Sequence, residues 1–330
     1  MSVYENGVPV MMVTQNEAMK KLMDTAERVA KTQATVLITG ESGSGKEVLA
    51  QFIHFKSKRH NKPYIVVNCG AIPKDIVESE LFGHEKGAFT GALHQKPGYF
   101  EMADQGTLFF DELVELPADT QVKLLRTLES SNFRRVGGEK ELSVDVRFIA
   151  ATNKDIQSQI KKGLFREDLF YRLGVIEMEI PPLRSRKDDI PLLIEHFMKI
   201  YIDKYEMPLT EISERSLKMM TFYSWPGNVR ELRNVIERLV ILYAGKVVEP
   251  EDLPIQFHEL EEYDDSSFVG SGNDIRIPVG SSMDQAERII INKTLSSVGN
   301  NISQAARILS VSRKTLHNKL NQFKENGITK

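Results

Sequence analysis

The sequence predicts an α/β fold in which a parallel sheet carries a phosphate-binding loop, followed by a helical lid and a small all-α module. Three observations support this. A glycine-rich loop stands between a β-branched run and a helical pattern, apolar runs ending in polar residues alternate with helical patterns, and the chain beyond residue 300 is basic. Strands that alternate with helices are typical of a parallel sheet, whose ligands bind at the carboxyl ends of the strands.

The bulk composition describes an ordinary globular chain. A length of 330 residues predicts either two domains or one large and one small domain. The net charge of −3 gives no whole-chain sign of nucleic-acid binding, so any such signal must be local. Cys69 is the only cysteine, which excludes an intrachain disulfide and favours a reducing compartment. Without an apolar run of transmembrane length or a secretory signal, we expect a cytoplasmic protein that has no membrane partner.

The glycine-rich loop has the pattern and the flanks of a P-loop. It follows the apolar run 35–39 and precedes the helical pattern 48–53. Its backbone N–H groups, the helix N-terminus and the lysine predict a site for nucleotide phosphates. The last residue stands where Ser or Thr normally contacts Mg²⁺. The alternative is a glycine turn that a lysine happens to follow. The loop consists of Gly40, Glu41, Ser42, Gly43, Ser44, Gly45, Lys46 and Glu47.

Three further apolar runs, at 64–68, 107–112 and 144–153, predict strands that end in polar groups. Downstream of a P-loop, Asp111 is placed to hold Mg²⁺ and Glu112 to act as general base on the attacking water. Asn68 and Asn153 could orient that water or sense the γ-phosphate. The alternatives are a solvated turn for the acidic pair and, for each asparagine, a strand-end amide that caps the following turn.

Between two of these strands, the sequence 81–92 contains three glycines within nine residues. Such a segment does not form a stable helix, so we expect a flexible loop with Phe89 and Thr90 near its tip. An exposed aromatic tip suggests a binding partner. On spacing alone, a glycine-rich surface turn with a buried Phe89 is the simpler interpretation.

The chain after residue 180 is predominantly helical. A turn-rich joint at 181–191 precedes amphipathic patterns at 192–205, 213–223 and 229–243, which predict a helical lid beside the nucleotide. We expect Trp225, the only tryptophan, to anchor the lid core, Asn228 to cap the helix that follows, and Arg230 to reach the γ-phosphate side.

The C-terminal part divides into an acidic linker and a basic module. Residues 247–274 contain nine acidic and no basic residues, a composition typical of a flexible linker. Helices are predicted at 284–297, 302–309 and 312–323, and the tight connection before the last of them indicates a helix-turn-helix that binds DNA as a dimer. The alternative is a solvated basic tail. The residues available to the major groove are Ser312, Arg313, Lys314, Thr315, His317, Asn318 and Lys319.

Six motifs occur together and in order, at 40–47, 87–92, 106–112, 151–153, 165–173 and 225–232. With them the chain resembles the bacterial enhancer-binding proteins, AAA+ ATPases that activate sigma-54 RNA polymerase. The motif Gly-Ala-Phe-Thr-Gly-Ala at 87–92 is the most specific. The resemblance implies an AAA+ α/β ATPase subdomain at 1–180, a lid subdomain at 181–256, a linker at 257–282 and a Fis-type helix-turn-helix domain at 283–330.

The resemblance also assigns roles around the nucleotide. Glu47 is the usual residue of this family's P-loop. Asn68 would be a switch that holds Glu112 until the polymerase is engaged. The cofactors would be ATP and Mg²⁺. Thr152 and Asn153 would form the first sensor, and Arg230 the second.

Partner contacts follow from the same resemblance. The loop of Gly87, Ala88, Phe89, Thr90, Gly91 and Ala92 would contact the sigma-54 RNA polymerase holoenzyme, supported by a second loop at 132–139, while the C-terminal domain binds enhancer DNA. Arg166 and Arg172 would be arginine fingers in the neighbouring subunit's site, which requires a ring, typically a hexamer, assembled from resting dimers. A planar guanidinium can donate two hydrogen bonds to a phosphoryl group and stabilise the charge on its oxygens during transfer. The alternative is a surface pair with Glu167 or Asp168.

Two other functions stay open at this point. One is a DNA-binding repressor with a degenerate nucleotide domain, and the intact Lys46, Asp111 and Glu112 argue against it. The other is a different AAA+ motor, for protein unfolding or branch migration, which would not need the 87–92 loop.

Overall fold

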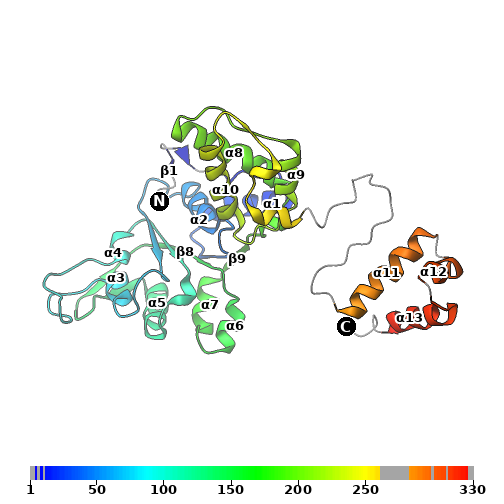
Figure 1. The fold of residues 1–330 in the computed structure, drawn as a ribbon. Helices are drawn as coiled ribbons and strands as arrows, with labels where there is room; N and C mark the ends of the chain where they lie inside the picture. Colours follow the sequence, from blue (N-terminus) through cyan, green and yellow to red (C-terminus); the bar gives the residue numbers. More distant parts are fainter. Residues whose placement is uncertain are drawn as a thin grey trace. The chain divides into compact units, whose positions relative to one another are not determined.

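A computed structural model describes residues 4–5, 8–9, 12–260, 282–298, 301–309 and 311–325. The chain divides into two compact units, Met1–Tyr263 and Asp264–Lys330, which are considered separately (Figure 1). No helix among the described residues is long and apolar enough to cross a membrane. The linker expected at 257–282 lies for the most part outside these residues.

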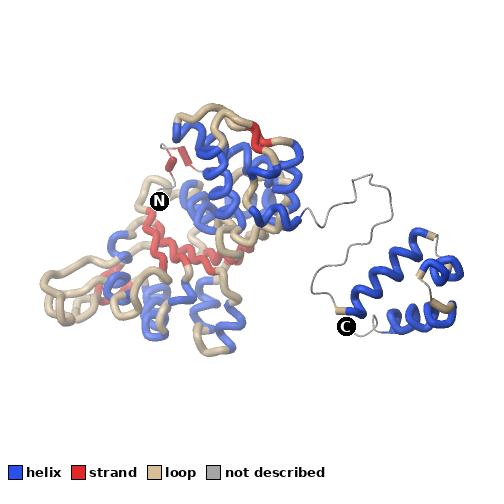
Figure 2. Tube along the Cα trace, viewed as in Figure 1, coloured by secondary structure: helices blue, strands red, loops and turns tan. Residues whose placement is uncertain are grey.

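A five-stranded parallel sheet forms the centre of the first unit, in the order β4-β5-β8-β3-β9. Helices lie on both sides of these strands, which are red in Figure 2. The predicted α/β class with a parallel sheet is therefore confirmed. The strands are β3 (Val36–Thr39), β4 (Tyr64–Asn68), β5 (Thr107–Asp111), β8 (Arg147–Thr152) and β9 (Ile176–Glu179).

The strands are apolar because both faces of the sheet are covered. Phe109 and Phe110 are adjacent and fully buried, and they belong to two different core clusters because successive strand side chains point to opposite faces. Every residue of the central strand β8 is buried. β8 begins at Arg147, later than the expected 144, and the Arg147 guanidinium donates to the carbonyls of Val29 and Ala30 at the end of α1.

Two helices, α1 (Glu17–Ala30) and α2 (Lys46–Phe55), cover one face with Met19, Leu49 and Ile53. The other face is covered mainly by α5 (Ala118–Ser130) and α7 (Glu167–Leu173). Shorter helices complete that layer: α3 (Val77–Phe82), α4 (Tyr99–Met102), η1 (Leu113–Glu115) and α6 (Ile156–Lys161).

The lid is built from three helices around the fully buried Trp225. The indole Nε1 donates to the Met220 carbonyl at 2.8 Å, so Trp225 is the core anchor that the sequence predicts. Phe257, beyond the lid boundary expected from the sequence, packs edge-on against this indole. The lid elements are η2 (Leu183–Ser185), α8 (Asp189–Tyr205), β10 (Glu211–Ile212), α9 (Glu214–Phe222), α10 (Asn228–Leu242), β11 (Val247–Val248), η3 (Pro250–Asp252) and η4 (Ile255–Leu260).

The buried carboxylate of Asp189 joins the lid to the segment before α1. It accepts the Thr14 hydroxyl at 2.8 Å and the backbone N–H groups of Gln15 and Asn16 at 2.7 and 3.0 Å. Arg186, also buried, lies 3.9 Å away. Near the N-terminus, β1 (Tyr4–Glu5) and β2 (Val8–Pro9) form an antiparallel pair.

We expect Asp189→Ala to lower the free energy of unfolding by about 3 kcal/mol. The substitution leaves buried hydrogen-bond donors without an acceptor and the buried Arg186 charge without a counter-charge. Urea denaturation measures the change. The matched control is Asp188→Ala at the exposed neighbouring position, which should shift the free energy by less than about 0.5 kcal/mol. Equal effects of the two substitutions would contradict this account of Asp189.

The second unit contains three helices among its described residues: α11 (Met283–Ser297), α12 (Ile302–Ile308) and α13 (Arg313–Glu325). Their small core consists of Ile291, Leu295, Ala305, Ala306 and Leu316. Asn301 caps α12 by accepting the N–H groups of Ser303 and Gln304. The three helices lie at the predicted places.

Candidate functional site

The P-loop connects the end of β3 to the start of α2, as the sequence predicts. Gly40, Gly43 and Gly45 all have positive φ values (148°, 74° and 109°), which L-residues with side chains rarely adopt. A Cβ atom on Gly43 would lie 2.4 Å from the Gly227 carbonyl oxygen of the lid. The three glycines therefore allow the curl of the loop, and Gly43 also allows its close contact with the lid.

Lys46 is the first residue of α2 and is buried beneath the loop. Its Nζ donates to the carbonyls of Gly40 and Glu41 at 2.8 and 2.9 Å. Burial lowers the pKa of Lys46, and the nearby Asp111 carboxylate opposes that shift. The structure thus holds a cation at the mouth of the P-loop, close to the acidic end of β5.

The acidic pair Asp111 and Glu112 ends β5, next to β4 and β8 in the sheet. Asp111 Oδ1 accepts the N–H of Glu112 at 3.1 Å, and Glu112 has the left-handed φ of 55°. Burial raises the pKa of Glu47, and the charge of Asp111 raises it further. The Asp111 charge therefore acts on both Lys46 and Glu47 at the P-loop.

The donor set can be compared with the needs of Mg²⁺. Among the described residues, no group of three or more His, Cys, Asp or Glu side chains could hold a metal ion. Mg²⁺ is usually bound by one or two carboxylates together with substrate phosphates and water. The carboxylates at the end of β5, beside a P-loop, fit this requirement.

Asn68 ends β4 directly opposite Asp111 in the register of the sheet. Its Oδ1 accepts the N–H of Ala71 at 3.0 Å, so here the amide caps the turn after the strand. A Cβ atom on Gly70 would lie 2.2 Å from Glu112 Oε2 and 3.5 Å from Asn68 Oδ1, so both side chains lie next to this glycine. Asn68 does not bond to Glu112 in this state, unlike the expected switch contact.

The first-sensor residues follow β8. Thr152 pairs with Thr39 at the carboxyl ends of neighbouring strands, so its position adjoins the start of the P-loop. The Thr152 hydroxyl accepts the N–H of Lys154 at 3.1 Å, and Asn153 is exposed. Strand order alone brings these residues, the acidic pair and the P-loop to one edge of the sheet.

The two expected arginine fingers bond within their own chain. Arg166 Nη2 and Nε donate to the Asp168 carboxylate at 2.6 and 3.0 Å, which is the surface pair that the sequence allowed as an alternative. Arg172 Nη2 donates to the Leu128 carbonyl at 2.8 Å. Among the described residues, neither arginine bonds to the P-loop.

The segment Gly87–Ala92 forms an exposed turn, as predicted. Gly87 and Gly91 have positive φ values of 82° and 106°, and a Cβ atom on either would meet no other atom within 4 Å. The Phe89 side chain is 43% exposed and its ring meets the His84 ring edge-on at 5.0 Å, so the simpler interpretation of a buried phenylalanine is wrong. Thr90 is exposed.

A hairpin of β6 (Asn132–Arg134) and β7 (Glu141–Ser143) supports this turn. A Cβ atom on Gly137 of the hairpin would lie 2.7 Å from the Ala88 Cβ. Arg135 bonds to Glu85 at 2.8 Å and to Glu101 at 2.9 Å, which ties the hairpin to both sides of the turn. The second loop expected at 132–139 thus lies against the first.

The lid contributes side chains that the sequence analysis did not assign. Asn228 was expected to cap α10, and this expectation is wrong: the N-cap is Gly227, and the Asn228 side chain bonds to Glu41 and to the Ser42 carbonyl instead. Arg184 forms a two-pronged ion pair with Glu41. The clustering of arginines in the 181–191 joint was the available signal.

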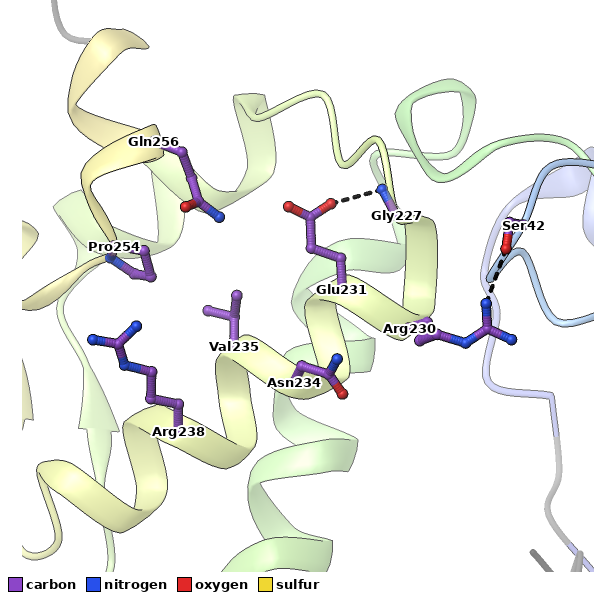
Figure 3. Close-up of a pocket in the computed structure, with 9 residues that line it drawn as sticks. All are labelled: Ser42, Gly227, Arg230, Glu231, Asn234, Val235, Arg238, Pro254 and Gln256. Carbon is purple, nitrogen blue, oxygen red and sulfur yellow. Dashed lines mark hydrogen bonds between the residues drawn. The ribbon is translucent and has the colours of Figure 1, made fainter.

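Arg230 lies between the P-loop and an open pocket of about 380 Å³ (Figure 3). Its Nη1 donates to the Ser42 hydroxyl at 2.9 Å, so the predicted second sensor does reach the P-loop. Figure 3 shows Arg230 extended towards Ser42, while Glu231 and Arg238 line the pocket from positions about two turns apart on α10.

In the second unit, Ser312 accepts the N–H of Thr315 at 3.0 Å and so caps α13 as predicted. Lys319 does not point freely from the helix, because it forms an ion pair with Glu287 of α11. The Asn318 side chain lies outside the described residues. Five candidate DNA-contacting residues are exposed: Ser312, Arg313, Lys314, Thr315 and His317.

The chain matches three sequence families in succession. Residues 12–179 match the Sigma-54 interaction domain, residues 184–268 the AAA+ ATPase lid domain, and residues 282–323 the Fis family of bacterial regulatory proteins. The first match covers half of the chain and includes the P-loop, the acidic pair and the 87–92 loop. These matches imply RNA polymerase and DNA as partners.

Relatives and solved structures agree with these matches. Regulatory protein AtoC of Escherichia coli is 43% identical over 94% of this chain and 67% of its own length. A signal-transduction and transcriptional-control protein of Clostridium beijerinckii is 45% identical, but the chain spans only 48% of it. NtrX of Brucella abortus, solved with ADP and with ATP, is 36% identical with a TM-score of 0.70, covering 94% of this chain and 68% of NtrX.

The family matches and the fold agree in order and extent, and the relatives include Transcriptional regulatory protein FlbD of Caulobacter vibrioides, 42% identical over 96% of this chain and 71% of FlbD. The chain therefore belongs to the sigma-54-dependent transcriptional activators, with an AAA+ ATPase and a DNA-binding helix-turn-helix.

Proposed function

We propose that the chain, bound to enhancer DNA in the cytoplasm, hydrolyses ATP in a ring and uses the 87–92 loop to convert a closed sigma-54 polymerase–promoter complex into an open one. The observation that carries this proposal is the convergence of Lys46, Asp111 and Glu112 at one edge of the sheet. A P-loop cation beside two carboxylates supplies the parts that phosphoryl transfer needs.

Each residue has a distinct role in the proposed hydrolysis. The P-loop N–H groups and Lys46 bind the phosphates, so that Lys46 exchanges its carbonyl partners for phosphate oxygens. Glu112 accepts the proton of the attacking water. Asp111 would hold Mg²⁺, which when bound neutralises charge on the phosphates. Thr152, Asn153 and Arg230 sense the terminal phosphate from the neighbouring strand and from the lid.

A neighbouring protomer completes the proposed site. Arg166 and Arg172 are partly exposed and their present partners are a surface carboxylate and a carbonyl oxygen, which they can exchange for phosphate at modest cost. Fingers supplied in trans require a head-to-tail ring, for which we propose a hexamer assembled from dimers. The helix-turn-helix, through Arg313, Lys314 and His317, holds this assembly on DNA.

The 87–92 loop is the proposed output. A Cβ atom on either of its glycines would meet no atom within 4 Å, Phe89 is 43% exposed and Thr90 is exposed. Suppose that the loop can take two positions. Nucleotide can shift it between them only if the ATP-bound and the ADP-bound protein favour different loop positions. In our proposal, Asn68 makes that link by leaving Ala71 and bonding to Glu112 in one of the states.

The test of the proposed chemistry is Glu112→Gln, which keeps the side-chain size and removes the base. We expect ATP to bind with near-normal affinity in calorimetry, whereas phosphate release slows by about 10²- to 10⁴-fold. The matched control is Glu115→Gln, which removes a surface ion pair with Lys154 and should leave hydrolysis intact. Hydrolysis by Glu112→Gln at the wild-type rate would exclude Glu112 as the base.

A further inference from the structure

The lid holds the P-loop from outside. In a P-loop the backbone N–H groups converge on the phosphates, which leaves the carbonyl groups facing away from the nucleotide. Here three consecutive carbonyls of the loop accept hydrogen bonds from the lid. The bonds run from Asn228 Nδ2 to Ser42 O (3.1 Å), from the Arg230 N–H to Gly43 O (3.3 Å) and from Arg186 Nη2 to Ser44 O (2.8 Å).

A side chain of the P-loop strengthens this contact. Arg184 Nη1 and Nη2 donate to the two carboxylate oxygens of Glu41 at 2.7 and 2.6 Å, a planar two-bond geometry that fixes direction as well as distance. Asn228 Nδ2 donates to the same carboxylate at 3.0 Å. These two partners hold the pKa of Glu41 at about 2, so Glu41 stays ionised at neutral pH.

The Asn228 side chain is held in one orientation within the lid. It is fully buried, its φ of 52° lies in the left-handed region, and its Oδ1 accepts the N–H of Leu183 at 2.8 Å. One amide group therefore joins the P-loop, the 181–191 joint and the first turn of α10. A shift of the loop by a fraction of an ångström must move this amide or break its bonds.

We propose that Glu41, Arg184 and Asn228 form a clasp that transmits nucleotide occupancy of the P-loop to the lid. Phosphate binding rearranges the loop from inside, and the clasp converts that change into movement of the turn before α10. The three residues act as positioning residues for the ATPase site. This inference rests on the proposed function only in requiring that nucleotide binds at the P-loop.

The only tryptophan of the chain reports on that turn. Trp225 stands three residues before Asn228, has a φ of 48° and packs edge-on against Tyr223 and Phe257 at 5.1 and 5.3 Å. Indole emission depends on such surroundings. The Trp225 fluorescence of the full chain should therefore change when ADP binds to the P-loop, without any label.

The experiment compares wild type with Arg184→Ala, Glu41→Gln and the double variant. ADP affinity is measured by calorimetry and Trp225 emission at saturating ADP. We expect each single variant to bind ADP within about tenfold of wild type, because the ion pair is solvent-accessible. In each single variant the ADP-dependent emission change should fall below about half of the wild-type change. In the double variant the emission change should be no smaller than in either single variant, because both substitutions remove the same ion pair.

The control is Lys218→Ala, which removes an exposed ion pair with Glu214 in the same lid and should leave the emission change intact. Arg184→Lys keeps the charge without the two-bond geometry and should restore the response in part. An undiminished response in both single variants, or a wild-type protein that binds ADP without any response, would overturn the clasp. Absence of ADP binding to wild type would instead overturn the proposed function as well.

Discussion

Lys46→Ala should abolish ATP hydrolysis. Lys46 is the only P-loop side chain that carries a positive charge, and the structure keeps it buried with two carbonyl oxygens as partners. Alanine removes the charge that faces the β- and γ-phosphates. We expect hydrolysis to fall by at least about 10²- to 10³-fold and ATP binding to become undetectable in calorimetry at micromolar concentrations.

The control for this substitution is Lys56→Ala at the end of the same helix. Lys56 forms an exposed ion pair with Glu27, so its removal should change neither hydrolysis nor stability appreciably. Thermal unfolding shows whether Lys46→Ala folds. If a folded Lys46→Ala variant still hydrolysed ATP, the phosphates would have to bind at a site other than the P-loop lysine.

Thr90→Ala should separate hydrolysis from activation. Thr90 lies at the exposed tip of the 87–92 turn, which is not part of the P-loop, so we expect its hydroxyl to have no part in phosphoryl transfer. We expect ATP hydrolysis within about twofold of wild type, because exposed substitutions rarely disturb a fold. Promoter opening by sigma-54 polymerase should fall to the level without activator.

The promoter assay needs a matched threonine control. Thr25→Ala on α1 removes another hydroxyl, at a half-buried position, where it donates to the Lys21 carbonyl and accepts from Arg28. This variant should hydrolyse ATP and open the promoter like wild type. Normal promoter opening by Thr90→Ala would show that the turn is not the output of the ATPase.

The sequence predicted those parts of the site that follow from chain order. The carboxyl ends of parallel strands meet at one edge of a sheet, so a P-loop after β3 and acidic residues after β5 had to converge. The elements were found because their apolar patterns are long and regular. The boundaries differ slightly, as at the start of β8. There the buried Arg147 guanidinium donates to the last carbonyl groups of α1, a contact that the local pattern does not indicate.

Side-chain partners could not be predicted in the same way. The pattern around Asn228 suggested a helix cap, but a buried amide near Glu41 has better partners in the P-loop than in its own helix. Lys319 was assigned to DNA from local charge, and the ion pair with Glu287 depends on how α11 packs. Such contacts join residues that the sequence separates by 30 to 190 positions and carry no local signal.

The central claim, that each ATP is hydrolysed between two protomers, is tested most directly by mixing two inactive variants. Lys46→Ala cannot bind ATP but retains its arginines, whereas Arg172→Ala binds ATP but lacks a finger. In an equimolar mixed ring, about a quarter of the interfaces would pair an intact P-loop with an intact finger.

ATP hydrolysis should therefore reappear on mixing, at up to about a quarter of the wild-type rate, although each variant alone is inactive. A mixture no more active than its separate components would show that Arg172 acts within its own protomer, and would contradict hydrolysis at a shared interface.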